Sequence, residues 1–269
     1  MNKKQIKKNY KAQKRKLRNE YKNAIANHRK EYRTRLSEVK ESLECDIAEY
    51  YLISGKKPPL DPPKRSLLEE IGNAVTHGVG SIFSIVALVL MLLAADRTVE
   101  TVSAVIYFFG MLMMFTMSCL YHAFAHGSAV KRLFRRFDYT GIYLLIGATF
   151  SPPLLSFIGG AFGMWFSIVQ WTLIALGITL IGVFGPTRFR FIHIPLYVIL
   201  GWSAILLLPT LMRGSPPLAM WILAGGIVYT LGLIPFMMKS KVAHFVWHFF
   251  VLAGALVQWI GIYTYIFLA

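Results

Sequence analysis

Seven long apolar runs restrict most strongly what this chain can fold into. A helix needs about 20 predominantly apolar residues to cross the hydrocarbon core of a bilayer. Continuous apolar runs of this length exclude barrel strands, so the sequence predicts an all-α polytopic membrane protein, a seven-transmembrane helix bundle. The expected spans are residues 75–95, 101–124, 139–157, 163–184, 191–211, 218–238 and 242–268.

Charge is concentrated before the first apolar run. Residues 1–65 contain 19 Lys/Arg and eight Asp/Glu, whereas residues 66–269 contain ten and five. The chain therefore divides into a basic extension, residues 1–65, and a membrane domain, residues 66–269. The extension has neither Pro nor Gly between Asn2 and Tyr50, which favours a helix, and a proline-rich link follows it.

One narrow apolar stripe runs along the C-terminal part of this predicted helix. We interpret the extension as a solvated, partly helical segment whose charge secures membrane topology. The alternatives are a coiled-coil contact or a basic surface helix held against anionic lipid headgroups. Basic residues are not interleaved with aromatic ones as nucleic-acid binding would require, so we expect no nucleic-acid partner. The stripe consists of Tyr32, Leu36, Val39, Leu43 and Ile47.

Loop charges orient the bundle. The second, fourth and sixth connections each carry at least two basic residues. The first, third and fifth connections together carry only two, Arg97 and Arg213. Positively charged loops stay on the cytoplasmic side of a membrane. We therefore expect a multi-pass protein of the cell (plasma) membrane with a cytoplasmic N-terminus and an extracellular C-terminus.

This topology gathers the ionisable and polar residues of the spans into one layer. Odd-numbered spans begin at the cytoplasmic face and even-numbered spans end there. Ionisable residues inside membrane spans are costly to bury and indicate functional sites. The layer contains Glu69, Glu70, His77, Ser118, His122, His126, Asp138, His193, His244 and His248.

Zinc chemistry would explain why histidines share this layer. His244 and His248 are four residues apart, so both imidazoles project from one helix face and can bind one ion. His122 on the facing helix could supply a third nitrogen, although His126, four residues later, is a rival. Three protein ligands leave the fourth zinc position for a water, whose pKa falls to about 7.

Two further residues could assist such a site. Asp138 could orient the water or accept its proton, and Ser118 could donate a hydrogen bond to a ligand or to a developing oxyanion. Asp138 also follows Arg135 and Arg136, so an interfacial salt bridge is its simpler role. His126 lies beyond the apolar run, which favours solvation. We interpret His193 as a residue at the membrane interface, because no second histidine lies one helical turn from it.

Four blocks of this sequence resemble the haemolysin III family, whose eukaryotic relatives are the progestin and adiponectin receptors. In chain order the blocks are Glu70-Ile-Gly-Asn73-Ala-Val-Thr76-His77, Ser118-Cys-Leu-Tyr-His122, the segment 136–152 around Asp138, and His244-Phe-Val-Trp-His248. The blocks extend from Glu70 nearly to the end of the chain, and the basic extension lies outside them.

The resemblance implies both a fold and a site. The family is a seven-helix bundle with a cytoplasmic N-terminus, and its pattern places Zn²⁺ on His122, His244 and His248, which favours His122 over His126. Asp138 would hold the zinc water, with Ser118 beside it.

Three functions follow from the sequence and the resemblance. The leading hypothesis is a zinc-dependent, ceramidase-like hydrolase of a lipid amide or ester, or a factor in membrane-lipid homeostasis. The second is a non-enzymatic receptor or sensor in which zinc clamps two helices together. The third, a pore-forming cytolysin, fits seven well-formed apolar spans poorly.

Overall fold

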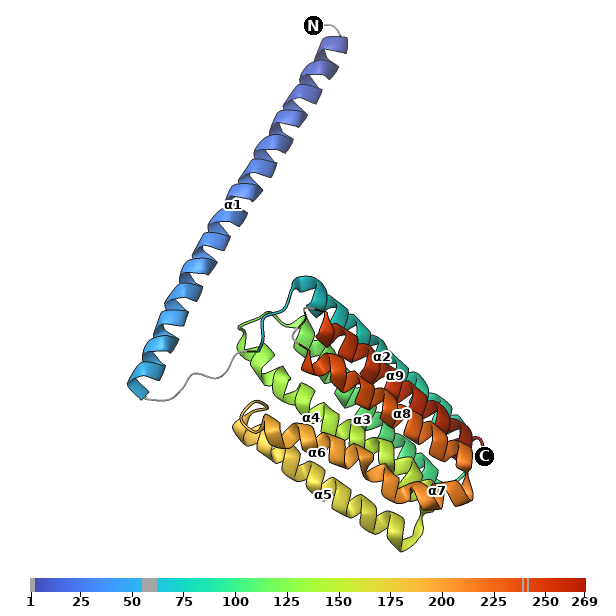
Figure 1. Ribbon diagram of the computed structural model, residues 1–269. Coiled ribbons are helices and arrows are strands. Elements are labelled where there is room, and N and C mark those ends of the chain that lie inside the picture. Colours follow the sequence, from blue (N-terminus) through green and yellow to red (C-terminus); the bar gives the residue numbers. More distant parts are fainter. Residues whose placement is uncertain (1–2, 55–61, 239, 241) are drawn as a thin grey trace. The chain divides into compact units, whose positions relative to one another are not determined.

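The protein is described here from a computed structural model, which covers residues 3–54, 62–238, 240 and 242–269. Contacts divide the chain into two compact units, Met1–Leu60 and Asp61–Ala269. Within the described ranges every regular element is helical (Figure 1). The predicted all-α class is therefore confirmed.

The first unit is one long helix, α1 (Lys3–Ser54). Its polar sequence, without Pro or Gly up to Tyr50, explains its continuity. The stripe residues Tyr32, Leu36, Val39 and Leu43 are all exposed. The side chain of Ile47 and most of the proline-rich link lie outside the described residues.

The second unit contains seven helices long and apolar enough to cross a membrane, which confirms the predicted number of spans. Two spans end in a π-helical segment, and another is interrupted by a 3₁₀ turn. In chain order they are α2 (Leu67–Ala94), α3 (Thr98–Ala123), α4 (Ala129–Ser151) with η1 (Pro152–Ile158), α5 (Gly160–Phe184), α6 (Arg190–Trp202) with η2 (Ser203–Leu207) and α7 (Leu208–Gly214), α8 (Pro216–Met237), and α9 (Ala243–Ile262) with η3 (Tyr263–Phe267).

Two helices begin well before their expected apolar runs because each has an N-terminal cap. Ser66 and Glu69 form a reciprocal capping box, so α2 starts at Leu67 rather than near residue 75. The Ser128 hydroxyl accepts a hydrogen bond from the Lys131 amide, so α4 starts at Ala129 rather than near residue 139. These extra turns place Glu70 and Lys131 on rigid helices.

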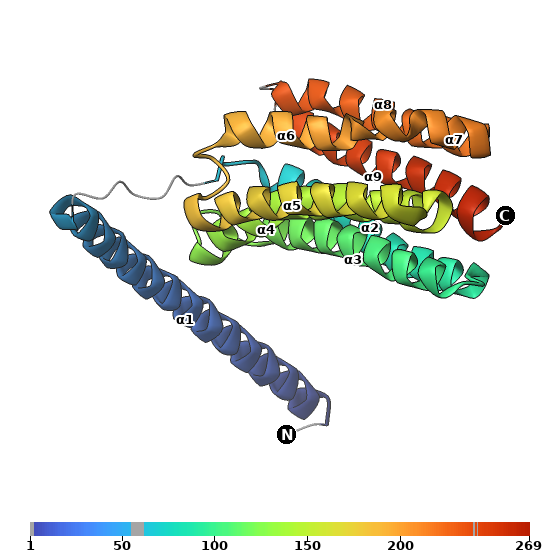
Figure 2. The same ribbon diagram turned by 90° about the horizontal axis from the view of Figure 1, so that it is seen from below.

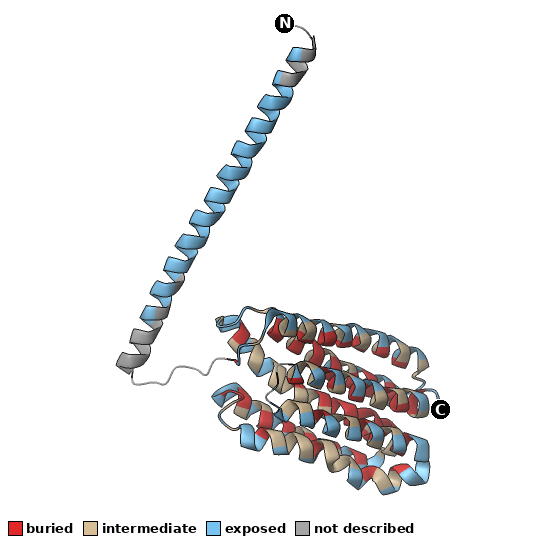
Figure 3. Ribbon diagram, turned by 45° about the horizontal axis from the view of Figure 1, so that its top comes forward, coloured by how far each residue is buried: buried red, intermediate tan, exposed pale blue. Residues whose placement is uncertain are grey.

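Small residues let the spans approach closely. A side chain at Gly80 would meet the Phe115 ring at 2.5 Å, and one at Gly72 would meet Phe245 at 2.7 Å. These contacts pack α2 against both α3 and α9, while α3 also packs against α4, and α9 against α8 (Figure 2). The buried residues lie on the parts of these helices that face one another (Figure 3). The N-terminal spans α2, α3 and α4 therefore pack with the C-terminal spans α8 and α9 through the contact between α2 and α9.

Candidate metal centre

Three histidines meet where α9 begins and α3 ends. His122 comes from the last turn of α3, and His244 and His248 come from the first two turns of α9. One potential ligand atom of each lies within 4.8 Å of those of the other two. Among the described residues, this is the one group of three or more His, Cys, Asp or Glu residues gathered in this way. The cluster could hold a metal ion.

The distances inside the cluster suit a shared ion. The Nε2 atoms of His244 and His248 are 3.3 Å apart. Two nitrogens that each lie 2.0–2.1 Å from a tetrahedral zinc are separated by about 3.4 Å. The Nε2 atom of His122 is buried and has no hydrogen-bond partner among the described residues. A buried imidazole nitrogen without a partner is costly, and a shared ion would satisfy it.

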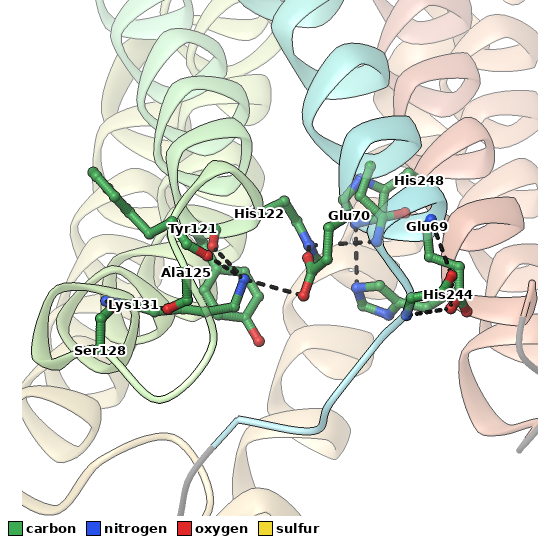
Figure 4. A network of polar contacts seen from close by, with 12 residues as sticks. Glu69, Glu70, Tyr121, His122, Ala125, Ser128, Lys131, His244 and His248 are labelled. Carbon is green, nitrogen blue, oxygen red and sulfur yellow. Dashed lines mark hydrogen bonds and ion pairs between the residues drawn. The ribbon is translucent and has the colours of Figure 1, made fainter. Parts of the chain in front are cut away.

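Glu70 determines which nitrogen of His122 faces the cluster. Its Oε2 atom lies 2.6 Å from His122 Nδ1 (Figure 4). The Asn73 amide nitrogen lies 3.3 Å from the same atom. The carboxylate therefore accepts the Nδ1 proton, which leaves the Nε2 lone pair available to a metal. A carboxylate behind a histidine is the usual support of a metal ligand, because it fixes the ring and raises its basicity.

Lys131 in turn holds Glu70. Its side chain is completely buried, and its ammonium lies 3.0 Å from Glu70 Oε1. The same ammonium donates hydrogen bonds of 3.0 Å to the carbonyl oxygens of Tyr121 and Phe124, at the C-terminal end of α3 (Figure 4). All three ammonium protons have acceptors, and the otherwise unpaired carbonyls of α3 are satisfied. Lys131 thus ties α2, α3 and α4 together behind His122.

His77 supports the cluster from another side. Its ring stacks on His248, with ring centroids 3.8 Å apart, and meets Phe115 edge-on. Neither of its ring nitrogens has a partner among the described residues. His77 therefore restricts the ring of His248 by contact and does not belong to the group of converging nitrogens.

Asp138 and Ser118 lie near His122, and Ser118 is one helical turn from it on α3. The Asp138 carboxylate interacts electrostatically with His122 and Ser118, and also with Arg65 and Arg135. The Ser118 hydroxyl is buried and has no hydrogen-bond partner among the described residues. The interaction of Asp138 with Arg135 accords with the simpler role, an interfacial salt bridge. Its interaction with His122 accords with the other role, that of orienting a metal-bound water or accepting its proton.

The two remaining histidines of the predicted layer lie outside the cluster. His126 is exposed in the connection between α3 and α4, which accords with the expected solvation. His193 lies in the first turn of α6, at the end of the span, and is 0% exposed. Packing against α4 explains this burial, since His193 Nδ1 shares a hydrogen bond of 3.0 Å with the Tyr143 hydroxyl.

Sequence reasoning did not assign roles to Glu70, Asn73, Lys131 or Arg65. Glu70 and Asn73 are three residues apart at the start of a span, and this spacing could have indicated a shared face towards the histidines. Lys131 resembles every other basic residue of its loop. Its burial depends on a contact between residues 61 positions apart, which no local pattern reveals.

The comparisons with known proteins agree with this architecture. The profile of the family described as "Haemolysin-III related" matches residues 65–259. The chain belongs to the haemolysin III family. The match includes every residue of the cluster and excludes α1, which lies outside the part of the chain that the family shares.

Individual relatives of this haemolysin III protein come from both bacteria and animals. It is 35% identical over 204 residues to "Hemolysin-3" of Bacillus cereus, covering 74% of this chain and 92% of the relative. It is 33% identical over 195 residues to "Hemolysin-3 homolog" of Bacillus subtilis (strain 168), covering 71% and 91%. It is 28% identical over 214 residues to the human "Monocyte to macrophage differentiation factor", covering 76% and 87%.

Proposed function

We propose that this protein is a zinc-dependent membrane hydrolase that cleaves an acyl amide or ester of a lipid at the cytoplasmic leaflet. His122, His244 and His248 would hold the ion. Bound there by three neutral imidazoles, a zinc ion supplies Lewis acidity and activates water at neutral pH. The positive-inside distribution of loop charges supports the cytoplasmic position.

The observation that carries the proposal is an apolar cavity that begins one helical turn from the cluster. Its volume is about 140 Å³, and its lining includes Met114, Ile142 and Val251. These residues lie three or four positions from Ser118, Asp138 and His248 on the same three helices, so they occupy neighbouring turns. Apolar cavities of this size stay dry, which favours an acyl chain as the occupant.

Asp138 and Ser118, which lie four positions from the lining residues Ile142 and Met114, have the chemistry that acyl hydrolysis needs. Asp138 would accept a proton from the attacking water and return it to the leaving group. Ser118, whose buried hydroxyl has no hydrogen-bond partner in the described part of the chain, would donate a hydrogen bond to the oxygen that gains charge on the scissile carbonyl. Residues of α6 and α8 also line the cavity, in which the acyl chain would lie.

Lipid hydrolysis by the purified chain tests the proposal. Proteoliposomes containing a panel of N-acyl and O-acyl lipids should release fatty acid, and His248→Ala should abolish the release. His193→Ala is the matched control, because it removes another buried histidine from the same end of the bundle without touching the cluster. Equal fatty-acid release by wild type and His248→Ala would disprove the hydrolase.

A cavity-filling pair tests the acyl-chain site separately. Gly226 lines the cavity, and a side chain there meets nothing within 4 Å, so Gly226→Leu should fill the cavity without a clash. Gly182, exposed on α5 and equally free of neighbours, provides the control Gly182→Leu. Gly226→Leu should raise KM for long-chain lipids more than for short-chain ones and leave metal content unchanged.

A metal clamp without catalysis is the second candidate. The tight cluster favours it, because an ion there would join α3 to α9 whether or not water reaches it. Such a clamp requires neither a cavity nor Ser118. Under this candidate, metal removal would lower the unfolding temperature, while wild type would release no fatty acid from any lipid of the panel.

A further inference from the structure

The apolar side chains of α1 follow an 11-residue repeat that extends well beyond the short stripe near its C-terminal end. Tyr10, Tyr21, Tyr32 and Leu43 stand 11 positions apart. Two parallel series with the same spacing lie beside them on the helix, namely Leu17, His28 and Val39, and Lys14, Ile25 and Leu36. The eight apolar members are 43% to 69% exposed, so the helix itself leaves the whole stripe uncovered.

This repeat keeps the stripe almost straight. Eleven residues make three turns at about 3.67 residues per turn, close to the 3.6 of an undistorted α-helix. Successive members of the stripe therefore drift by only about 20° around the helix. A straight stripe on a straight helix matches a flat surface, whereas pairing with another helix requires a right-handed supercoil.

Charge is unevenly distributed along α1. Residues 1–30 contain twelve Lys/Arg and a single acidic residue, Glu20. Lys11, Arg18 and Lys22 each directly follow a stripe residue, so they lie about 100° around the helix from it, on one flank. Apolar side chains flanked by cations are typical of helices that lie in the interface of an anionic membrane.

We propose that the N-terminal half of α1 docks along an anionic bilayer surface, with Tyr10, Leu17, Tyr21 and Ile25 inserted among the lipid headgroups. A parallel second copy fits this half poorly, because it would bring two clusters of twelve cations together with only Glu20 on each chain to offset them.

Accessibility of single sites in the full-length chain tests the docking. The two native cysteines are first removed by Cys45→Ser and Cys119→Ala. A nitroxide is then attached to a single new cysteine, either Tyr21→Cys on the stripe or Asn23→Cys on the opposite face. Each protein is placed at one chain per nanodisc, in phosphatidylcholine alone or in an equimolar mixture with phosphatidylglycerol. The collision rate with a neutral, water-soluble nickel chelate measures exposure to water.

The proposal predicts shielding that depends on both face and lipid. With phosphatidylglycerol, the collision rate at residue 21 should fall at least about threefold, while residue 23 stays accessible. Both sites should stay accessible in phosphatidylcholine alone. Unchanged collision rates at residue 21 in both lipids would overturn the proposal. Shielding that appears only when discs hold two chains would overturn it in favour of a second copy.

Two matched charge variants test the orientation. Lys22→Gln removes a cation that flanks the stripe, and Lys30→Gln removes the same charge from the opposite face of α1. Each cation near an anionic surface contributes about fivefold to docking, so Lys22→Gln should lower the docking constant about fivefold and Lys30→Gln far less. Equal losses would overturn an oriented docking. Circular dichroism of each variant checks that α1 remains helical.

Discussion

Two histidines at the same end of the bundle differ in what surrounds them. His122 and His193 are both buried, each has its Nδ1 atom in a hydrogen bond, and each has an Nε2 atom without a partner among the described residues. Two further imidazoles lie beside His122. His193 instead lies among tyrosine rings, and within the described ranges it belongs to no such group.

The difference shows that burial and an unpaired nitrogen do not by themselves indicate a metal ligand. The supporting residue behind each ring also differs, since Glu70 is a carboxylate and Tyr143 is a hydroxyl. A carboxylate raises the basicity of an imidazole more strongly, which suits a ligand. Convergence of nitrogens and a carboxylate behind one of them together distinguish the candidate site from a histidine that serves packing.

Removal of the cluster should give the largest effect. The triple variant His122→Ala, His244→Ala and His248→Ala should lose stoichiometric metal, because no ligand set remains, whereas His193→Ala should keep it. Elemental analysis of the purified proteins, together with a measurement of metal affinity, provides the comparison. Equal loss of metal from His193→Ala would show that the two histidine environments do not differ in the way proposed.

Lys131→Met should cause the next largest effect, a loss of stability. The variant leaves the partly buried Glu70 carboxylate without its cation, and the loss should approach the roughly 3–5 kcal/mol found for fully buried pairs. Unfolding of the reconstituted protein in increasing denaturing detergent measures the change. Arg136→Met, which removes an exposed cation from the same helix, is the control and should change stability by less than about 0.5 kcal/mol. Similar values for both variants would contradict a specific role for Lys131.

Glu70→Gln should weaken metal binding without abolishing it. Residues that support a ligand typically contribute 10- to 100-fold to metal affinity, and the variant replaces the carboxylate that orients His122 with a neutral amide. Competition with a chelator of known affinity measures the change. Glu69→Gln is the matched control, because Glu69 contacts Ser66 at the start of α2 and does not contact the cluster. Unchanged affinity in Glu70→Gln would remove Glu70 from the site.

The sequence predicted the spans well because their number depends on local length and apolarity, which any stretch of about 20 residues reveals. It predicted the start of α2 and α4 less well, since the caps at Ser66 and Ser128 extend both helices beyond their apolar parts. Cap signals occur in polar segments, where hydropathy gives no information.

The candidate site was predictable in part for a similar reason. The spacing of His244 and His248 is local, and the alternation of loop charges placed His122 at the same depth. Loop charges could not show that Lys131 turns inward to Glu70, or that His193 turns away from the cluster to Tyr143. Both outcomes depend on how helices rotate about their axes, which the packing of glycines and rings determines.

Tyr143→Phe should give the smallest effect and sharpens the comparison most. It removes the hydroxyl that satisfies His193 Nδ1 and keeps the ring that fills the space opposite Gly177. Hydrogen bonds between membrane helices average about 0.6 kcal/mol, so stability in denaturing detergent should fall by about that amount. Metal content should be unchanged, because the bond lies outside the cluster. A fall in metal affinity would mean that α4 and α6 transmit strain to the cluster, and the two histidine environments would then form one coupled unit.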